Sequence, residues 1–212
     1  MTDAGAPGTG HVFRAVLASA NAHKLEELRQ ALPGWEITPL GQRDYPPETG
    51  ASYAENAALK ARFGLAHATA DALAIGEDSG IEVVALEGRP GIASARWAAD
   101  GVTRLLDELG TATDRRARYV CAMVAVASDG TEVAVEGTLE GSIVTGQRRG
   151  DQGFGYDPIF VPLGETRTVA ELGDDWKRAH SHRAHAAAAL AAAVGAVPPA
   201  SVPASVPGSV SP

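Results

Sequence analysis

The chain has 212 residues, 45% of them apolar, which is enough for one large domain with its own core. Its net charge of −8 excludes the broad basic face that general binding of nucleic acid or anionic membrane requires. The single cysteine, Cys121, excludes a disulfide and a thiolate metal cluster, and its apolar surroundings predict a buried, inert thiol. Neither a signal peptide nor a membrane-spanning run is recognisable, so we expect a cytoplasmic protein.

The N-terminal region predicts a buried strand over Val12–Ala18 and a helix from Ala22 to Leu32, whose leucines recur at helical spacing. Ser19 and Asn21 lie in capping positions between them. A polar loop that leads from a strand into a helix N-terminus is a ready anion site. Lys24 opposes the usual preference for acids in a first helical turn, which a nearby anion would explain. Simple capping beside a solvated lysine explains these residues equally well.

The next segment contains one acid with a structural role and one without. Gln42–Gly50 is a polar loop that carries Glu48. The pattern from Ser52 to Glu55 is a capping box, which opens a helix to about residue 70 with Lys60 midway. Glu55 is therefore explained as a helix cap. Glu48 caps nothing recognisable and remains a candidate ligand.

The stretch Gly76–Gly80, read GEDSG, lies between the apolar runs Ala72–Ile75 and Ile81–Leu86. This pattern predicts a strand, a corner and a second strand. Glu77 and Asp78 in such a corner would suit a hard cation such as Mg²⁺, because open α/β sheets bind ligands beyond their strand ends. Considered alone, the stretch is explained equally well as a solvated acidic turn.

The middle of the chain predicts a helix over Val102–Leu109 and two strands over Arg118–Ala127 and Thr131–Gly137. Asp129 and Gly130 between these strands are a hairpin signal. The first strand is an almost continuous apolar run, which indicates a central position in the sheet. Helices followed by strands around one shared sheet predict a mixed α/β or α+β architecture.

The last third of the chain has two further candidate groups. Phe154 and Tyr156 flank a glycine in a chain with only 5% aromatic residues, which favours a flat surface for a purine over simple packing of aromatics in a turn. Lys177, His182 and Arg183 form a donor cluster that could read a carbonyl-bearing base, although a surface cluster is the alternative. Ser181 is a suitable cap for the Ala-rich helix that follows.

Lysine usage separates these stretches from the rest of the chain. Only three of the 18 basic residues are lysines, and each falls in one of the stretches described above. A compact ammonium group makes point contacts with phosphate oxygens. Chance placement is the alternative explanation.

Together these stretches resemble the noncanonical purine nucleoside triphosphate pyrophosphatases, the inosine/xanthosine triphosphatase family. The resemblance covers roughly residues 12–190, and the common order of four motifs makes it specific. These motifs are SANAHKLEEL from Ser19, ETGASYAENAALKA from Glu48, EDSGIEVVALEGRPGIASAR from Glu77, and GFGYDPIF from Gly153 with SHR at Ser181.

The resemblance implies an α/β fold, with a mixed twisted sheet flanked by helices in two lobes and an active site in the central cleft. It also implies a homodimer that uses Mg²⁺ to hydrolyse ITP, dITP and XTP to the monophosphate and pyrophosphate, which cleanses the nucleotide pool. We expect one domain over residues 11–195. Residues 1–10 and the Pro- and Ser-rich residues 196–212 predict disordered tails.

Roles are carried over by position. The resemblance implies that Glu48 and Asp78 hold the metal and that Asp78 is also the general base. Lys60 would reach the phosphates, and Ser79 would contact the substrate. The other implied binding residues are Ser19, Ala20, Asn21, Ala22, His23 and Lys24 around the triphosphate, Phe154, Gly155, Tyr156 and Asp157 in the base pocket, and Lys177, His182 and Arg183 over the base and its 6-oxo group.

The chain departs from the family pattern in two places. Glu77 precedes Asp78 where the family usually has a second aspartate, and the segment after Arg96 is shorter than usual. Two alternatives therefore stay open. One is a related pyrophosphatase for pyrimidine or modified nucleotides, and the other is a nucleotide-binding module without catalysis.

Overall fold

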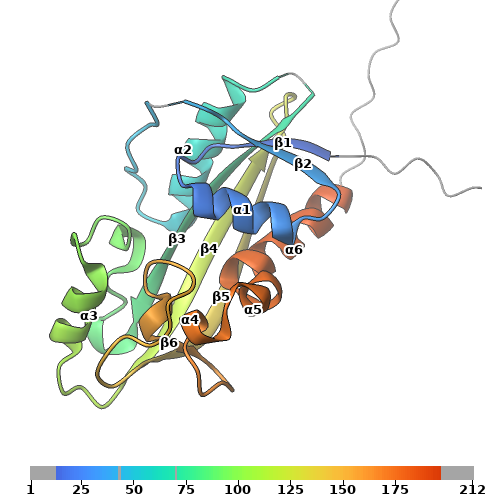
Figure 1. Ribbon diagram of the computed structural model, residues 1–212. Coiled ribbons are helices and arrows are strands. Elements are labelled where there is room, and N and C mark those ends of the chain that lie inside the picture. Colours follow the sequence, from blue (N-terminus) through green and yellow to red (C-terminus); the bar gives the residue numbers. More distant parts are fainter. Residues whose placement is uncertain (1–12, 43, 70, 197–212) are drawn as a thin grey trace, which may run out of the picture.

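The computed structural model describes residues 13–42, 44–69 and 71–196. Residues 1–10 and 197–212 of the predicted tails lie outside these ranges, and Ala196 is the last residue of the final helix. The described chain forms one six-stranded sheet in the order β2-β1-β3-β4-β5-β6 (Figure 1). Its strands are β1 (Phe13–Leu17), β2 (Trp35–Pro39), β3 (Leu73–Val83), β4 (Arg116–Val126), β5 (Glu132–Ile143) and β6 (Phe160–Pro162).

The sheet is mixed, as predicted, because β1 runs parallel to β2 and β3 while the other neighbours are antiparallel. The helices cover both faces of the sheet (Figure 1). They are α1 (Ala22–Ala31), α2 (Tyr53–Leu65), α3 (Gly101–Leu109), α4 (Val169–Leu172), α5 (Asp174–His180) and α6 (His182–Ala196), with short 3₁₀ turns η1 (Val84–Leu86), η2 (Gly91–Ala93) and η3 (Asp157–Ile159). No helix among the described residues is long and apolar enough to cross a membrane.

Strand β4 is buried on both faces, which confirms its predicted central position. Side chains alternate between the two faces of a strand. Cys121 and Met123 pack with Leu28 of α1 and Leu190 of α6, whereas Val124 packs under α2 on the opposite face. The buried Cys121 thiol was predicted, and burial raises its pKa well above the usual value.

A second apolar cluster occupies the other end of the long strands. It includes Ile81 of β3, Tyr119 of β4, Leu105 of α3 and Phe160 of β6. On β3, residues of odd number face the same side as Ile75 in the first cluster and Ile81 in the second. The polar part of β3 therefore lies between two packed ends of one sheet.

The predicted corner at Gly76–Gly80 is wrong, because β3 runs through it without a break. Ten consecutive residues, Ala74–Val83, pair with β4 and hold the backbone extended. The glycines are required by close packing rather than by a turn. A Cβ atom on Gly76 would overlap the carbonyl oxygen of Ala57 in α2.

Other predicted boundaries also moved. The strand expected to reach Leu86 ends at Val83, where the chain turns into η1, and the helix expected to reach residue 70 ends at Leu65. Strand β5 continues beyond Gly137 to Ile143, because it pairs with β4 as far as Ser142 and with β6 at Ile143. The hairpin itself is confirmed, with Gly130 at φ +85° in the turn.

We expect Gly76→Ala to destabilise the fold strongly, because its methyl group would meet backbone that cannot rotate away. Overpacking typically costs about 1–3 kcal/mol, and backbone overlap places this variant at or above the upper end. Chemical denaturation measures the loss. Gly195→Ala is the matched control, because a Cβ there meets nothing within 4 Å. Equal stability of the two variants would contradict this packing.

Candidate functional site

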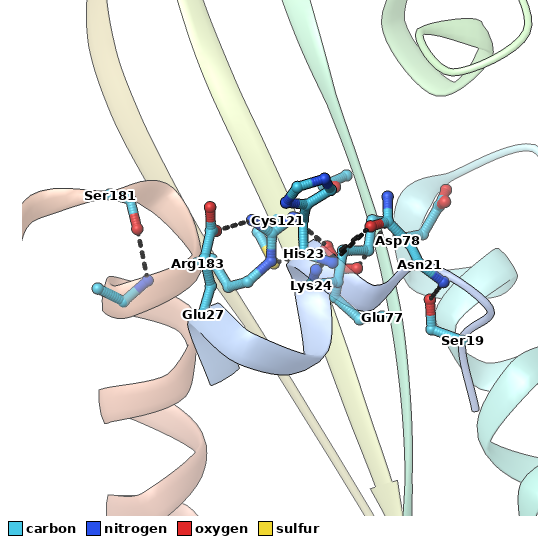
Figure 2. A network of polar contacts seen from close by, with 12 residues as sticks. Ser19, Asn21, His23, Lys24, Glu27, Glu77, Asp78, Cys121, Ser181 and Arg183 are labelled. Carbon is cyan, nitrogen blue, oxygen red and sulfur yellow. Dashed lines mark hydrogen bonds and ion pairs between the residues drawn. The ribbon is translucent and has the colours of Figure 1, made fainter. Parts of the chain in front are cut away.

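The loop after β1 forms the predicted helix cap. Asn21 is the N-cap of α1, and its Oδ1 accepts hydrogen bonds from the backbone N–H groups of His23 at 3.0 Å and Lys24 at 3.4 Å. Ser19 Oγ accepts from the N–H of Asn21 at 3.2 Å (Figure 2). Strand β1 pairs with β3 only as far as Ile75, so within the described part of the chain no strand pairs with the polar part of β3 on this side. The loop and this free edge adjoin each other.

The two neighbouring carboxylates, Glu77 and Asp78, point to opposite faces of β3. Asp78 faces α2, where its Oδ1 accepts from Lys60 Nζ at 3.0 Å and its Oδ2 accepts from Asn56 Nδ2 at 3.1 Å. Glu77 faces α1, where Lys24 Nζ lies 2.6 Å from its Oε2. The interpretation of this pair as a joint cation site in a corner is therefore wrong, because strand geometry separates the side chains.

Glu77 is enclosed by positive charge. Arg183 Nη2 donates to its Oε1 at 3.1 Å, and the Cys121 thiol donates to the same oxygen at 3.3 Å (Figure 2). Glu77 is only 1% exposed. Burial alone would raise the pKa of this carboxyl group, but Lys24 and Arg183 outweigh it and hold the pKa well below the usual value. Glu77 is therefore a buried anion that ties α1 to α6.

Glu48 and Asp78 meet at one cation. The Lys60 ammonium contacts the Glu48 carboxylate and Asp78 Oδ1, and it also donates to the carbonyl oxygen of Glu77 at 3.1 Å. The other oxygen of Glu48 pairs with Arg96. Burial raises the pKa of Asp78, although Lys60 and Asn56 partly oppose this shift. Two carboxylates from separate segments thus already surround one positive charge.

This arrangement fits part of a Mg²⁺ site. Mg²⁺ in phosphoryl-transfer sites commonly has one or two carboxylate ligands, with water and substrate oxygens completing its shell. Glu48 and Asp78 supply two carboxylates of this kind. Within the described residues no group of three or more His, Cys, Asp and Glu side chains gathers around a metal position. A metal here would therefore take water or substrate oxygens as its remaining ligands.

The predicted base-binding residues come together on the α1 side of the sheet. The Lys177 ammonium lies over the Phe154 ring, 4.5 Å from the ring centroid. The His23 ring stacks on Phe154 with 5.2 Å between the two centroids. Asp157 Oδ2 accepts from Lys177 Nζ and from the N–H of Phe154, both at 2.9 Å. Asp157 is therefore a structural anchor for this corner.

Lys177 and Arg183 share an acid that sequence reasoning did not select. Glu27 Oε1 lies 2.6 Å from Lys177 Nζ, and its Oε2 contacts Arg183. The only signal for Glu27 in the sequence is its i+3 spacing from Lys24, which places both residues on one face of α1. The alternative of a surface cluster is therefore wrong, because Lys177 and Arg183 are buried and paired with acids.

His182 is buried and neutral. Its ring stacks on Tyr119 at 4.6 Å with an interplanar angle of 12°. Burial and the charge of Arg183 lower the pKa of the imidazole well below its usual value. Its buried Nδ1 has no hydrogen-bond partner among the residues that the structure describes.

A cavity of about 390 Å³ joins most of these side chains. Glu48, Lys60 and Asp78 do not line it and form a separate group beyond β3. Of the remaining predicted residues, Ala20, Ala22 and His23 are exposed at the start of α1. The predicted residues that line the cavity are Asn21, Lys24, Ser79, Phe154, Gly155, Tyr156, Asp157, Lys177, His182 and Arg183.

The sequence profile of the Ham1 family matches residues 15–193. The chain belongs to the Ham1 family. It is 46% identical over 185 residues to the dITP/XTP pyrophosphatase of Deinococcus deserti, and the alignment covers 84% of this chain and 87% of that protein. The chain is also 44% identical over 187 residues to the dITP/XTP pyrophosphatase of Deinococcus radiodurans, and that alignment covers 84% of this chain and 92% of the other protein.

Solved Ham1 structures share the fold. The Staphylococcus aureus Ham1 protein superposes with a TM-score of 0.76 at 35% identity, covering 86% of this chain and 98% of that one. The nucleoside-triphosphatase, or dITP/XTP pyrophosphatase, of Mycobacterium abscessus gives 0.66 at 41% identity, with coverages of 84% and 97%. The family resemblance and the mixed, helix-flanked sheet predicted from the sequence are both confirmed.

Proposed function

We propose that this protein hydrolyses noncanonical purine nucleoside triphosphates, namely dITP, XTP and ITP, to the monophosphate and pyrophosphate. One observation carries the proposal. Asp78, with a raised pKa, lies beside Lys60 and Glu48, while the adjacent Glu77 holds Lys24 at the edge of a cavity lined by base-reading donors. Relatives named dITP/XTP pyrophosphatase support dITP and XTP as substrates.

We propose that Glu48 and Asp78 hold Mg²⁺ together with phosphate oxygens of the substrate. The ion would neutralise charge on the polyphosphate. Lys24 and Lys60 would add two fixed positive charges beside the phosphates. In phosphoryl transfer, such positioning and charge neutralisation supply most of the rate enhancement.

Asp78 would orient and deprotonate the water that attacks the α-phosphorus. The water oxygen forms a new bond to this phosphorus, the bond to the bridging oxygen of the β-phosphate breaks, and pyrophosphate leaves. The proton passes to the carboxylate of Asp78. Burial raises the pKa of Asp78 and makes it a stronger base than a solvated aspartate.

The base would be selected by donors that face its 6-oxo group. Lys177, His182 and Arg183 all line the cavity beside Phe154. Adenine has an amino donor at this position, so its binding would place donor against donor and leave buried polar groups unpaired. Lys177 and His23 contact the Phe154 ring, so a base that stacks on a face that either residue occupies would have to displace that residue.

A substrate panel tests the function. We expect dITP, ITP and XTP with Mg²⁺ to release pyrophosphate with kcat/KM at least about 100-fold above that for dATP, because buried donors reject a mismatched donor. ATP, GTP, dTTP and UTP complete the panel. Equal turnover of ITP and ATP would contradict the proposed selectivity. Preference for dTTP or UTP would support a pyrimidine pyrophosphatase, and ITP binding without product would support a binding module.

The homodimer implied by the family resemblance is a separate proposal. Sedimentation velocity tests it by measuring the mass of the particle in solution. We expect a species of twice the chain mass of 21.8 kDa. A monomer at micromolar concentration would contradict it.

A further inference from the structure

Arg96 is a cation beside Glu48 that the proposed function does not use. It follows η2, and its backbone N–H donates to Ala93 O at 2.9 Å. The same segment is fixed beside β3 because Ser94 Oγ accepts from the N–H of Ile81 at 2.9 Å. The Arg96 guanidinium contacts Glu48, which belongs to the loop before α2. Arg96 thus reaches the site from a different segment than Lys24 and Lys60.

Four charged groups form a chain in the order Asp78, Lys60, Glu48 and Arg96. Asp78 is at one end, where attack on the α-phosphorus would occur. The cavity proposed for the base is lined by Ser94 and Ala95 of the segment that carries Arg96, but not by any of the four charged groups. Arg96 is at the end of this chain of charges remote from Asp78, where β- and γ-phosphates that extend from Asp78 past Lys60 and Glu48 would reach it.

Arg96 is also the accessible cation of the group. Its side chain is 47% exposed, compared with 12% for Lys60 and 15% for Lys24. Lys24 pairs with the buried Glu77, and Lys60 pairs with Asp78 as well as with Glu48. The ion pair found for Arg96 is with Glu48. If Glu48 binds Mg²⁺, its attraction for Arg96 weakens and the guanidinium can pair with phosphate oxygens. Arginine suits this role because its planar fork binds phosphate in a bidentate manner.

We infer that Arg96 binds the pyrophosphate part of the substrate and stabilises it as the leaving group. This inference rests on the proposed function and extends it to a further residue. In the free protein, Glu48 holds the guanidinium near the site. With substrate bound, Arg96 contacts β- and γ-phosphate oxygens but does not contact the nucleoside monophosphate.

The two reaction products separate these contacts without turnover. Calorimetry should measure binding of inorganic pyrophosphate and of IMP, each with Mg²⁺, to the wild type and to Arg96→Ala, Arg96→Lys and Arg89→Ala. Arg89 is the matched control, because its ion pair with Glu108 has exposures of 56% and 27%, close to the 47% and 28% of Arg96 and Glu48. Thermal denaturation checks that each variant is folded. If Arg96→Ala is unstable, Arg96→Gln replaces it.

We expect Arg96→Ala to weaken pyrophosphate binding by about 10- to 100-fold and to change IMP binding by less than about twofold. The affinity of Arg96→Lys for pyrophosphate should lie between the affinities of Arg96→Ala and the wild type. Arg89→Ala should bind pyrophosphate as tightly as the wild type. Unchanged pyrophosphate binding to Arg96→Ala would overturn the inference. Equal losses for both products, or a loss that saturating Mg²⁺ restores, would also overturn it, because Arg96 would then only position Glu48.

A wild-type protein that hydrolyses dITP would separate failure of this inference from failure of the proposed function. If the wild type releases pyrophosphate but Arg96→Ala binds it normally, only the role of Arg96 is wrong. A wild type that neither hydrolyses dITP nor binds pyrophosphate would overturn both.

Discussion

Asp78→Asn should lower kcat for dITP by at least about 100-fold, and up to about 10,000-fold, while the fold remains intact. General base catalysis typically contributes factors of this size. The amide retains the shape of the side chain but cannot accept the proton from water, and it loses the charge that pairs with Lys60 at 3.0 Å. Steady-state release of pyrophosphate measures the effect.

The control for this variant is Glu82→Gln. Glu82 lies four residues along β3 on the same face as Asp78, where its partner is Arg118 at 2.8 Å. We expect its kcat to stay within about twofold of the wild type, since exposed pairs contribute little. If Asp78→Asn retained the turnover of Glu82→Gln, Asp78 would not be the base.

Glu77→Gln should destabilise the protein by about 3–5 kcal/mol, because removing one member of a buried charge network leaves its partners uncompensated. Lys24 and Arg183 both lose the charge of Glu77. For a domain of this size, this loss corresponds to a melting temperature roughly 6–20 °C lower. Glu77→Asp keeps the charge on a shorter side chain, so it should lose less.

The difference between wild type and Glu77→Gln should depend on pH. The folded protein holds the pKa of Glu77 well below its usual value of about 4.5, so ionised Glu77 stabilises the fold above that pH. This contribution is lost as pH falls through the folded-state pKa. Melting curves with a metal chelator should therefore differ most near pH 7 and converge in acid. A difference of the same size at pH 7 and pH 3.5 would contradict the role of Glu77.

The sequence predicted most of the residues that gather at the site, and the lysines illustrate why. Lys24, Lys60 and Lys177 all prove to be largely buried and paired with acids, Lys24 and Lys177 at the cavity and Lys60 in the group beyond β3. In an Arg-rich chain, their positions carried information because buried point charges are costly and rarely placed without a partner. The caps at Asn21 and Ser52 were predictable because capping depends on local sequence alone.

The GEDSG stretch was misread because two different structural situations require a glycine. A glycine is required in many turns, but also where another backbone approaches closely. Only the tertiary structure shows that Gly76 packs against α2. The same error placed Glu77 and Asp78 in one site, although they lie on opposite faces of β3.

Glu27 and Asn56 were missed because their roles depend on distant partners. Glu27 contacts Lys177 and Arg183, which follow it by about 150 residues in the chain. Asn56 donates to Asp78 across α2 and β3. Their helical spacings, Lys24 to Glu27 and Asn56 to Lys60, were the only available signals, and such spacings are common on any helix.

Hydrolysis of dITP in ¹⁸O-labelled water tests the central claim most directly, namely that Asp78 directs water at the α-phosphorus beside a cation held by Glu48 and Asp78. Mass spectrometry of the products locates the label. We predict one ¹⁸O atom in dIMP and none in pyrophosphate. Label in pyrophosphate, or release of orthophosphate as the first product, would contradict this account.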